Sequence, residues 1–129
     1  MIVVDSSVWI DYFNGTDTRE ANLLDDLLGN EPLMIGDLIL TEVLQGFRSD
    51  SDYESARDAL DTLIFTPMVG RDVALASAEN YRALRSKGFT IRKTIDVLIG
   101  TFCLENNHQL LHSDRDFDIM EKHLNLMTV

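Results

Sequence analysis

The chain has a single cysteine and no long apolar run, and both shortages limit where it can work. Cys103 is the only cysteine among 129 residues, so no disulfide can form within the chain. No apolar stretch approaches the roughly 20 residues that a membrane-spanning helix needs. The apolar start, Met1 to Val4, is too short for a signal peptide and has no basic leader. We therefore expect a cytoplasmic protein without a membrane segment.

Proline and glycine are also scarce. The chain holds two prolines and seven glycines, with no linker and no low-complexity stretch. A length of 129 residues is typical of one compact domain with a real core. We expect a single domain over residues 1–129.

Positive charge is the third shortage. Eleven Lys and Arg residues stand against 22 Asp and Glu residues, for a net charge of −11. Taken alone, this balance argues against nucleic acid, because phosphate binding normally needs a basic surface. The acids either serve solubility, or some of them gather to hold cations that supply the missing positive charge. Composition leaves both interpretations open.

Short apolar segments alternate with amphipathic ones along the chain. Strands are predicted at residues 2–4, 33–35, 64–66, 109–112 and 124–129. Helices are predicted at residues 7–13, 18–28, 37–47, 51–63, 72–87, 94–106 and 117–122, with Asp37 as a cap. This alternation indicates an α/β fold in three layers, with a central, mostly parallel sheet and helices on both faces.

Four acids occupy positions that a parallel sheet brings to one edge. Asp5 directly follows the first strand, and Asp114 comes just after the strand at residues 109–112. Glu42 lies on the helix face opposite Leu40, Val43 and Phe47, and Asp96 falls in the first turn of a helix. Ligands of such sheets gather outside the carboxyl ends of the strands. We expect the four carboxylates to converge there.

Asp96 is the most informative of these acids. The segment from Ile95 to Leu104 is apolar nearly all round, which predicts a buried helix. Asp96 shares a face with Gly100 and Cys103, whose small side chains allow close packing. A buried carboxylate is costly unless something compensates it. The alternative is an acid that stabilises the helix start, but Thr94 is the expected cap and leaves Asp96 free.

The other acids also have structural interpretations. Asp5 can cap the helix that follows it, Glu42 can be a solvated helix glutamate, and Asp114, Asp116 and Asp118 can form a polar capping loop. If they converge, they suit Mg²⁺ or Mn²⁺, which take oxygen ligands. Two such ions roughly 4 Å apart can catalyse phosphodiester hydrolysis.

Four motifs in order resemble the PIN-domain family, and within it the VapC-type toxins of toxin–antitoxin pairs. The resemblance covers nearly the whole chain. It is carried by Val3-Val4-Asp5-Ser6-Ser7-Val8-Trp9-Ile10, Thr41-Glu42-Val43-Leu44-Gln45-Gly46, Thr94-Ile95-Asp96-Val97-Leu98-Ile99-Gly100 and Leu110-Leu111-His112-Ser113-Asp114-Arg115-Asp116-Phe117.

The resemblance implies a PIN-like fold and a catalytic, metal-binding quartet at Asp5, Glu42, Asp96 and Asp114, with Asp116 as a fifth ligand. It also implies supporting roles for Ser6 and Ser113. Members of the family cleave RNA with Mg²⁺ or Mn²⁺, usually as homodimers, and are silenced by a cognate antitoxin.

The surface that grips RNA is less clear from the sequence. Arg92, Lys93 and Arg115 are the cations nearest the motifs and are candidate phosphate contacts, although solvated positions suit them equally. His112 can act in proton transfer or as a partly buried strand histidine. The aromatic residues of the first helix (Trp9, Tyr12 and Phe13) and Cys103 are expected in the core.

Other functions fit the sequence less well. Haloacid dehalogenase phosphatases need an acid two residues after the first, where this chain has Ser7. The acid set of a receiver domain is missing, and nucleases of structured DNA carry insertions for which 129 residues leave no room. The remaining alternative is a PIN-like RNA- or protein-binding module without activity.

Overall fold

A parallel sheet of four short strands forms the centre of the molecule. The computed structural model describes residues 1–129. The strands are β1 (Ile2–Val4), β2 (Leu33–Gly36), β3 (Ile64–Thr66) and β4 (Gln109–Leu111), and their order across the sheet is β3-β2-β1-β4. Every pairing is parallel, and β1 pairs residue by residue with β4 from Ile2 to Val4. The expected α/β class with a parallel sheet is confirmed.

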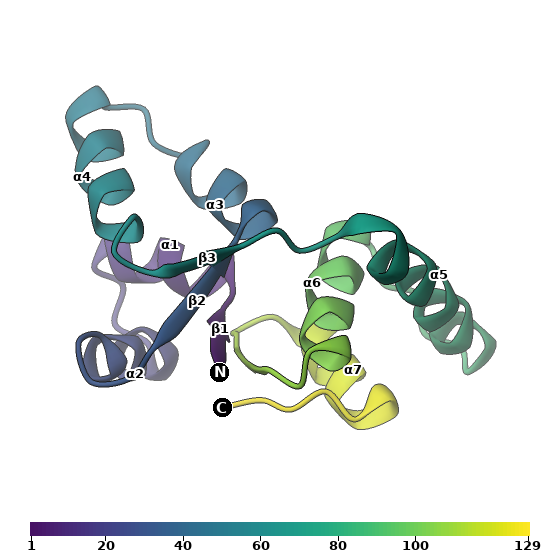
Figure 1. The fold of residues 1–129 in the computed structure, drawn as a ribbon. Helices are drawn as coiled ribbons and strands as arrows, with labels where there is room; N and C mark the ends of the chain where they lie inside the picture. Colours follow the sequence, from purple (N-terminus) through teal and green to yellow (C-terminus); the bar gives the residue numbers. More distant parts are fainter.

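Seven helices cover the two faces of this sheet. Figure 1 shows α1 to α4 on one side of the strands and α5 to α7 on the other. Their bounds are α1 (Ser6–Asn14), α2 (Arg19–Leu27), α3 (Asp37–Leu44), α4 (Asp50–Leu60), α5 (Gly70–Ser86), α6 (Thr94–Glu105) and α7 (Arg115–Leu124). None of them combines the length and apolar character needed to cross a membrane.

The order of the strands fixes where a site can form. From β1 to β2 to β3 the chain moves toward one edge of the sheet, and it then crosses back to place β4 on the other side of β1. Because parallel crossovers are right-handed, this reversal sends the helices to opposite faces. The carboxyl ends of β1 and β4 therefore flank a crevice, which is where ligands bind in sheets of this kind.

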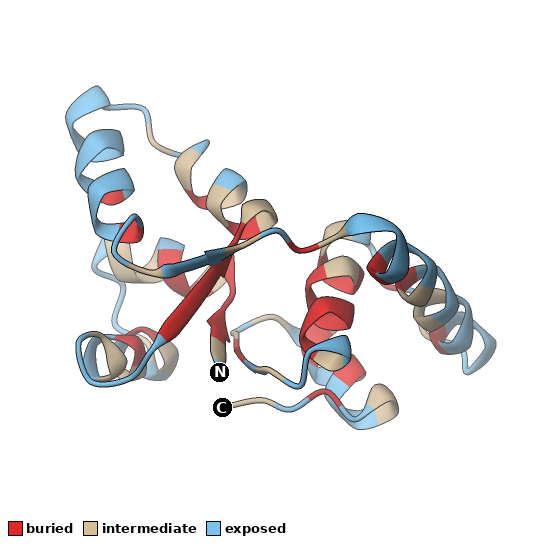
Figure 2. Cartoon of the chain, viewed as in Figure 1, coloured by how far each residue is buried: buried red, intermediate tan, exposed pale blue.

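The core lies between the sheet and the helices that pack on it. Val3, Val4, Leu110 and Leu111 are fully buried, so the two central strands are covered on both faces. The helices differ in burial, as Figure 2 shows: α6 is buried along most of its length, whereas α4 and α5 are largely exposed. The edge strand β3 is open, with Phe65 54% exposed.

Close packing of α6 depends on Gly100. A Cβ atom on this residue would lie 2.2 Å from Cε and 2.8 Å from Sδ of Met120, which is fully buried on α7. The small residue thus lets α7 approach α6, as its position beside Asp96 led us to expect. Cys103, on the same helix, is also fully buried, and burial raises the pKa of its thiol to about 12, as suits a core residue.

Several predicted element boundaries are wrong. The predicted last strand at residues 124–129 is absent: Leu124 ends α7, and only Thr128 forms a parallel bridge, with Leu110. The helix predicted through Phe47 ends at Leu44, and its N-cap is Gly36 rather than Asp37. The Asp37 carboxylate instead accepts hydrogen bonds from the backbone N–H groups of Leu38 and Met68, at 2.9 and 3.1 Å.

The contact between Gly100 and Met120 predicts a specific loss of stability. Gly100→Val should lower the free energy of unfolding by about 1–3 kcal/mol, because added carbon in a packed core forces neighbours to move. Met120→Ala removes a similar volume and should cost about 2–5 kcal/mol alone. The double variant should be more stable than the sum of the two losses predicts, when measured by urea unfolding. A Gly100→Val variant as stable as the unmodified chain would contradict this packing.

Candidate metal centre

Asp5 lies where β1 meets α1. Its backbone N–H donates to the Leu111 carbonyl at 2.9 Å, which continues the pairing of β1 with β4 up to the site. One carboxylate oxygen, Oδ2, caps α1 by accepting from the Ser7 backbone N–H at 3.1 Å and from the Ser7 hydroxyl at 2.6 Å. The capping role considered for Asp5 is confirmed. It occupies one oxygen only, and Asp5 is 3% exposed.

Glu42 reaches the same region from α3. Its Oε1 accepts a hydrogen bond of 3.0 Å from the hydroxyl of Ser6, which is buried at the start of α1. Glu42 is half-buried and faces α1 rather than bulk solvent. The sequence expectation that Ser6 supports the site agrees with this hydrogen bond.

Asp96 enters from the first turn of α6 and is 4% exposed. The expectation that Thr94 caps this helix is wrong. Lys93 occupies the N-cap position, and no side chain caps the helix start. Thr94 is the first helical residue and is exposed, so its hydroxyl is solvated. The carboxylate of Asp96 is nevertheless free of any capping bond, because its Oδ2 has no hydrogen-bond partner.

Asp114 and Asp116 complete the group from the turn between β4 and α7. Oδ1 of Asp114 caps α7 by accepting from the Asp116 backbone N–H at 2.9 Å. One carboxylate oxygen from each of Asp96, Asp114 and Asp116 lies within 4.8 Å of the other two. The structure thus brings these three acids into ligand distance of a common point, with Asp5 and Glu42 beside them.

Burial and like charges act together on this group. Burial raises the pKa of Asp5 above its usual value, against hydrogen bonds from Ser7 and the Ser6 backbone, and the nearby Asp114 raises it further. Burial also raises the pKa of Glu42, and Asp5 adds to this, whereas the Ser6 hydrogen bond and Lys93 oppose it.

The effect is largest at Asp96. Burial, together with the charges of Asp5, Asp114 and Asp116, raises the pKa of this carboxyl to about 7, although Lys93 lowers it. The contributions of neighbouring charges, although smaller than that of burial, arise because the acids lie close together.

Two buried carboxylate oxygens in the group have no hydrogen-bond partner. They are Oδ1 of Asp5 and Oδ2 of Asp96. A buried anionic oxygen without a donor is costly, and a cation is the partner that would satisfy several such oxygens at once. Carboxylate oxygens alone form a hard donor set, which suits Mg²⁺ or Mn²⁺. The residues present therefore fit a divalent metal.

The candidate RNA contacts lie next to the acids. Arg92, Lys93 and Arg115 are exposed and line, together with Asp114 and Asp116, a cleft of about 380 Å³. None of the three cations pairs with a carboxylate, since the chain has two ion pairs and both lie elsewhere. By contrast, the hydroxyl of Ser113 is exposed and makes no hydrogen bond, so nothing in its contacts indicates a supporting role.

Sequence reasoning missed two residues that hold the acids in place. Ser7 fixes Asp5, as described above, and its spacing two residues after a capping acid was the available signal. His112 fixes the turn that carries Asp114, because its Nδ1 accepts a 3.2 Å hydrogen bond from the Asp114 backbone N–H. An imidazole engaged in this way is poorly placed for the proton transfer considered from the sequence.

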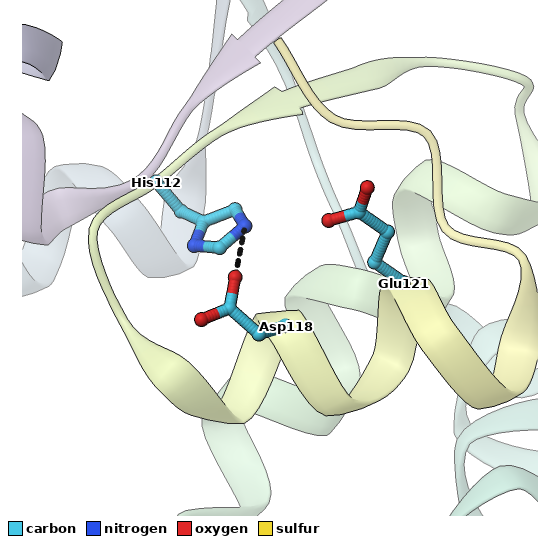
Figure 3. Close-up of side chains that lie close together, drawn as sticks. All are labelled: His112, Asp118 and Glu121. Carbon is cyan, nitrogen blue, oxygen red and sulfur yellow. Dashed lines mark ion pairs between the residues drawn. The ribbon is translucent and has the colours of Figure 1, made fainter.

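Figure 3 shows a second acidic group, in which Asp118 points toward His112 and Glu121 lies farther along α7. One ligand atom from each residue lies within 4.8 Å of the others. However, Nδ1 of His112 already accepts a hydrogen bond, so in the neutral ring Nε2 carries the proton and has no lone pair for a metal. The group is thus a contact at 3.8 Å between Nε2 of a nearly buried imidazole and the exposed carboxylate of Asp118.

The aromatic residues of α1 serve mainly as core, as expected. Trp9 is 2% exposed and lies 5.9 Å from Phe13, ring centre to ring centre. Phe13 in turn lies 5.7 Å from Phe47, which follows α3. Tyr12 and Phe13 are half-buried, so this aromatic cluster begins in the core and ends at the surface.

Comparison with known proteins agrees with this fold. A model of the PIN domain matches residues 2–122. The chain is 31% identical to the VapC ribonuclease Mb1587 of Mycobacterium bovis and to ribonuclease VapC11 of Mycobacterium tuberculosis, in each case over 98% of this chain and 96% of the relative. Its fold resembles a chain in the crystal structure of VapBC2 from Rickettsia felis bound to a DNA fragment, with a TM-score of 0.78, 20% identity and coverage of 100% and 98% of the two chains. The chain belongs to the PIN-domain family, in the group of the VapC-type ribonucleases.

Proposed function

We propose that this chain is a metal-dependent endoribonuclease and the toxin of a VapBC-type toxin–antitoxin pair. The observation that carries the metal dependence is the pair of buried, unpartnered carboxylate oxygens on Asp5 and Asp96, within a group of five acids. In a protein of net charge −11, a cation held by these acids would add to the positive charge that Arg92, Lys93 and Arg115 bring to the crevice.

In this proposal the acids divide the work by position. Asp96, Asp114 and Asp116 converge on one point and would hold the cation there. Asp5 offers its free Oδ1 from the other side, while its Oδ2 remains bound to Ser7. Glu42, held by Ser6, would bind or orient a ligand on the α3 side of Asp5. When bound, Mg²⁺ or Mn²⁺ supplies Lewis acidity toward a phosphodiester and the positive charge that the acids lack.

The surrounding residues prepare the crevice for that role. Ser6, Ser7 and His112 fix the acids through hydrogen bonds, so little rearrangement is needed on binding. Lys93 partly compensates the acids, and Arg92 and Arg115 border the cleft where a phosphate backbone would approach.

The partners follow from the same family membership. We propose a cognate antitoxin as inhibitor and a homodimer as the working assembly, both in the cytoplasm. Solved relatives include VapBC and FitAB assemblies. Phe13 and Phe47, the outer part of the aromatic cluster, line a groove that also contains polar residues, and an antitoxin helix could place apolar side chains against these two rings. A basic side chain of that partner would take the electrostatic place of a metal.

Asp5→Asn tests the catalytic role. Asparagine is an equally good helix cap, so the fold should persist, but one anionic ligand is lost. Cleavage of single-stranded RNA in Mg²⁺ or Mn²⁺ should fall by at least about 100-fold, since even the outer partners of metal ligands are worth 10- to 100-fold. Chelator should abolish the activity of the unmodified chain. Asp118→Asn, in the other acidic group, is the control and should remain active. Robust cleavage by Asp5→Asn, or in chelator, would defeat the proposal.

Asp96→Asn tests the electrostatic strain at the site. A carboxyl whose pKa is about 7 when folded and 3.8 otherwise binds its proton more tightly in the folded state. Its stabilising contribution is therefore complete below about pH 4 and is lost as the pH rises through 7. Without metal, Asp96→Asn should melt at least as high as the unmodified chain at pH 8, with an advantage of up to about 4 kcal/mol that shrinks toward pH 4.

Added Mn²⁺ should raise the melting temperature of the unmodified chain more than that of Asp96→Asn, because metal binds the folded site selectively. The variant should also be inactive. If the unmodified chain ignores millimolar Mn²⁺ and the variant still cleaves RNA, Asp96 does not belong to the site.

The antitoxin proposal predicts a stoichiometric inhibitor. Co-expression with the protein from the adjacent reading frame should yield a complex that does not cleave RNA, and separating the two chains should restore cleavage. If a stoichiometric partner binds and RNA cleavage is unchanged, the partner does not cover the proposed active site, and the inhibitory role is wrong.

A further inference from the structure

The few cations of this acidic chain are concentrated in one segment. Residues 80–95 contain five of the 11 Lys and Arg residues and none of the 22 Asp and Glu residues. The segment covers the end of α5, the connection that follows and the first turn of α6. A local positive surface is unexpected in a chain of net charge −11, and it ends at the metal centre.

Two of these cations lie on a groove that the proposed site does not include. Arg82 and Arg85 are exposed on α5 and line a groove of about 560 Å³ between α5 and α6. Neither forms an ion pair with a carboxylate. The Arg85 guanidinium lies 5.6 Å from the centre of the Tyr81 ring, so a cation and an aromatic face stand side by side at the groove.

The groove ends close to the cleft beside the acids. Thr94, the first residue of α6, lines the groove, and its neighbour Lys93 lines the cleft together with Asp114 and Asp116. Figure 1 shows α5 lying outside α6, with the connection between them leading back toward the sheet. Lys87 takes no part, because its Nζ is directed to the His123 carbonyl at 3.5 Å.

We propose that the groove between α5 and α6 binds single-stranded RNA, with Arg82 and Arg85 contacting phosphates and the strand continuing past Lys93 to the acids. This rests on the proposed ribonuclease function and assigns part of its substrate path. Guanidinium groups bind phosphate oxygens in a two-pronged geometry, and the half-buried ring of Tyr81 would stack on a base with the part that Arg85 does not cover. Ala74, Ser77 and Ala78, which lie earlier on α5, also line the groove, and their small side chains leave room for a nucleotide.

Charge complementarity favours RNA over another protein in this groove. The groove offers two unpaired guanidinium groups and no carboxylate. A second copy of this chain would bring a net charge of −11 and no regular array of anions, whereas an RNA strand brings one phosphate per nucleotide. Docking of protein on α5 is accordingly one outcome of the test below.

The test compares two double variants that remove the same charge. Arg82→Gln/Arg85→Gln alters the groove, and Arg19→Gln/Arg57→Gln removes two exposed cations from α2 and α4, on the other side of the sheet. Binding of a fluorescein-labelled 20-nucleotide single-stranded RNA is followed by anisotropy in Ca²⁺ over a range of salt concentrations. Single-turnover cleavage in Mn²⁺ is followed in parallel.

The groove variant should bind RNA about 5-fold or more weakly, and the slope of log affinity against log salt should fall by about 1.4, since each phosphate contact on a single strand contributes roughly 0.7. Its cleavage rate at saturating enzyme should stay within about twofold, because the acids are untouched. Arg82→Lys/Arg85→Lys should keep most of the salt slope, and the control pair should match the unmodified chain.

Equal losses in the groove and control variants would overturn the proposal, as would unchanged RNA binding. A groove variant with normal RNA affinity but an altered sedimentation coefficient would assign α5 to protein contact instead. Failure of the ribonuclease proposal is distinguishable, because an unmodified chain that cleaves nothing can still be scored for RNA affinity and salt slope in the Ca²⁺ measurement.

Discussion

Mutual repulsion between buried carboxylates is the constraint to which the rest of the site responds. Asp5 and Asp96 are almost inaccessible to water, and Asp114, Asp116 and Glu42 stand beside them. Water cannot screen these charges as it would at the surface, so the protein must supply partners. It supplies a serine for each of Asp5 and Glu42, a backbone N–H for Asp114, and one lysine. Those partners leave two buried carboxylate oxygens, Oδ1 of Asp5 and Oδ2 of Asp96, without a hydrogen bond, and a bound cation would satisfy both.

The acids are carried by regular secondary structure rather than by long loops. Asp5 and Asp114 follow strands and cap α1 and α7, Asp96 and Asp116 lie in the first turns of α6 and α7, and Glu42 lies within α3. Four of the five acids therefore sit at or near helix starts. Helix starts favour negative charge, because the free N–H groups there carry partial positive charge. The same residues thus stabilise helices and form the acidic group proposed to hold a metal. This explains why the capping and catalytic interpretations of Asp5 and Asp114 do not exclude each other.

The sequence was most informative where chemistry and pattern coincide. An acid directly after the first strand singled out Asp5, an acid shortly after the last predicted buried strand singled out Asp114, and an aspartate in a nearly wholly apolar helix singled out Asp96 as candidates. Patterns of hydrophobicity failed at element ends. Residues 124–129 look like a strand, yet Leu124 ends α7, Asn125 caps the helix in a left-handed conformation, and only Thr128 then forms a bridge, with Leu110.

Thr94 was a reasonable cap by residue type, but α6 begins at Thr94 itself, one residue earlier than a Thr94 cap would require, so Lys93 takes the cap position. The sequence could not predict that the arginines of α5 line a groove, because the groove exists only where α5 packs against α6.

The pairing of β1 with β4 has a consequence for the synthesis of the chain. Asp5 is among the first residues to leave the ribosome, whereas its neighbour Asp114 belongs to a strand-end turn more than a hundred residues later. No shorter piece of the chain can bring the two together, since β4 is the strand that completes the crevice. A nascent chain therefore lacks a complete set of ligands until translation is nearly finished. A ribonuclease built in this way stays inactive while it is still on the ribosome that is translating its mRNA.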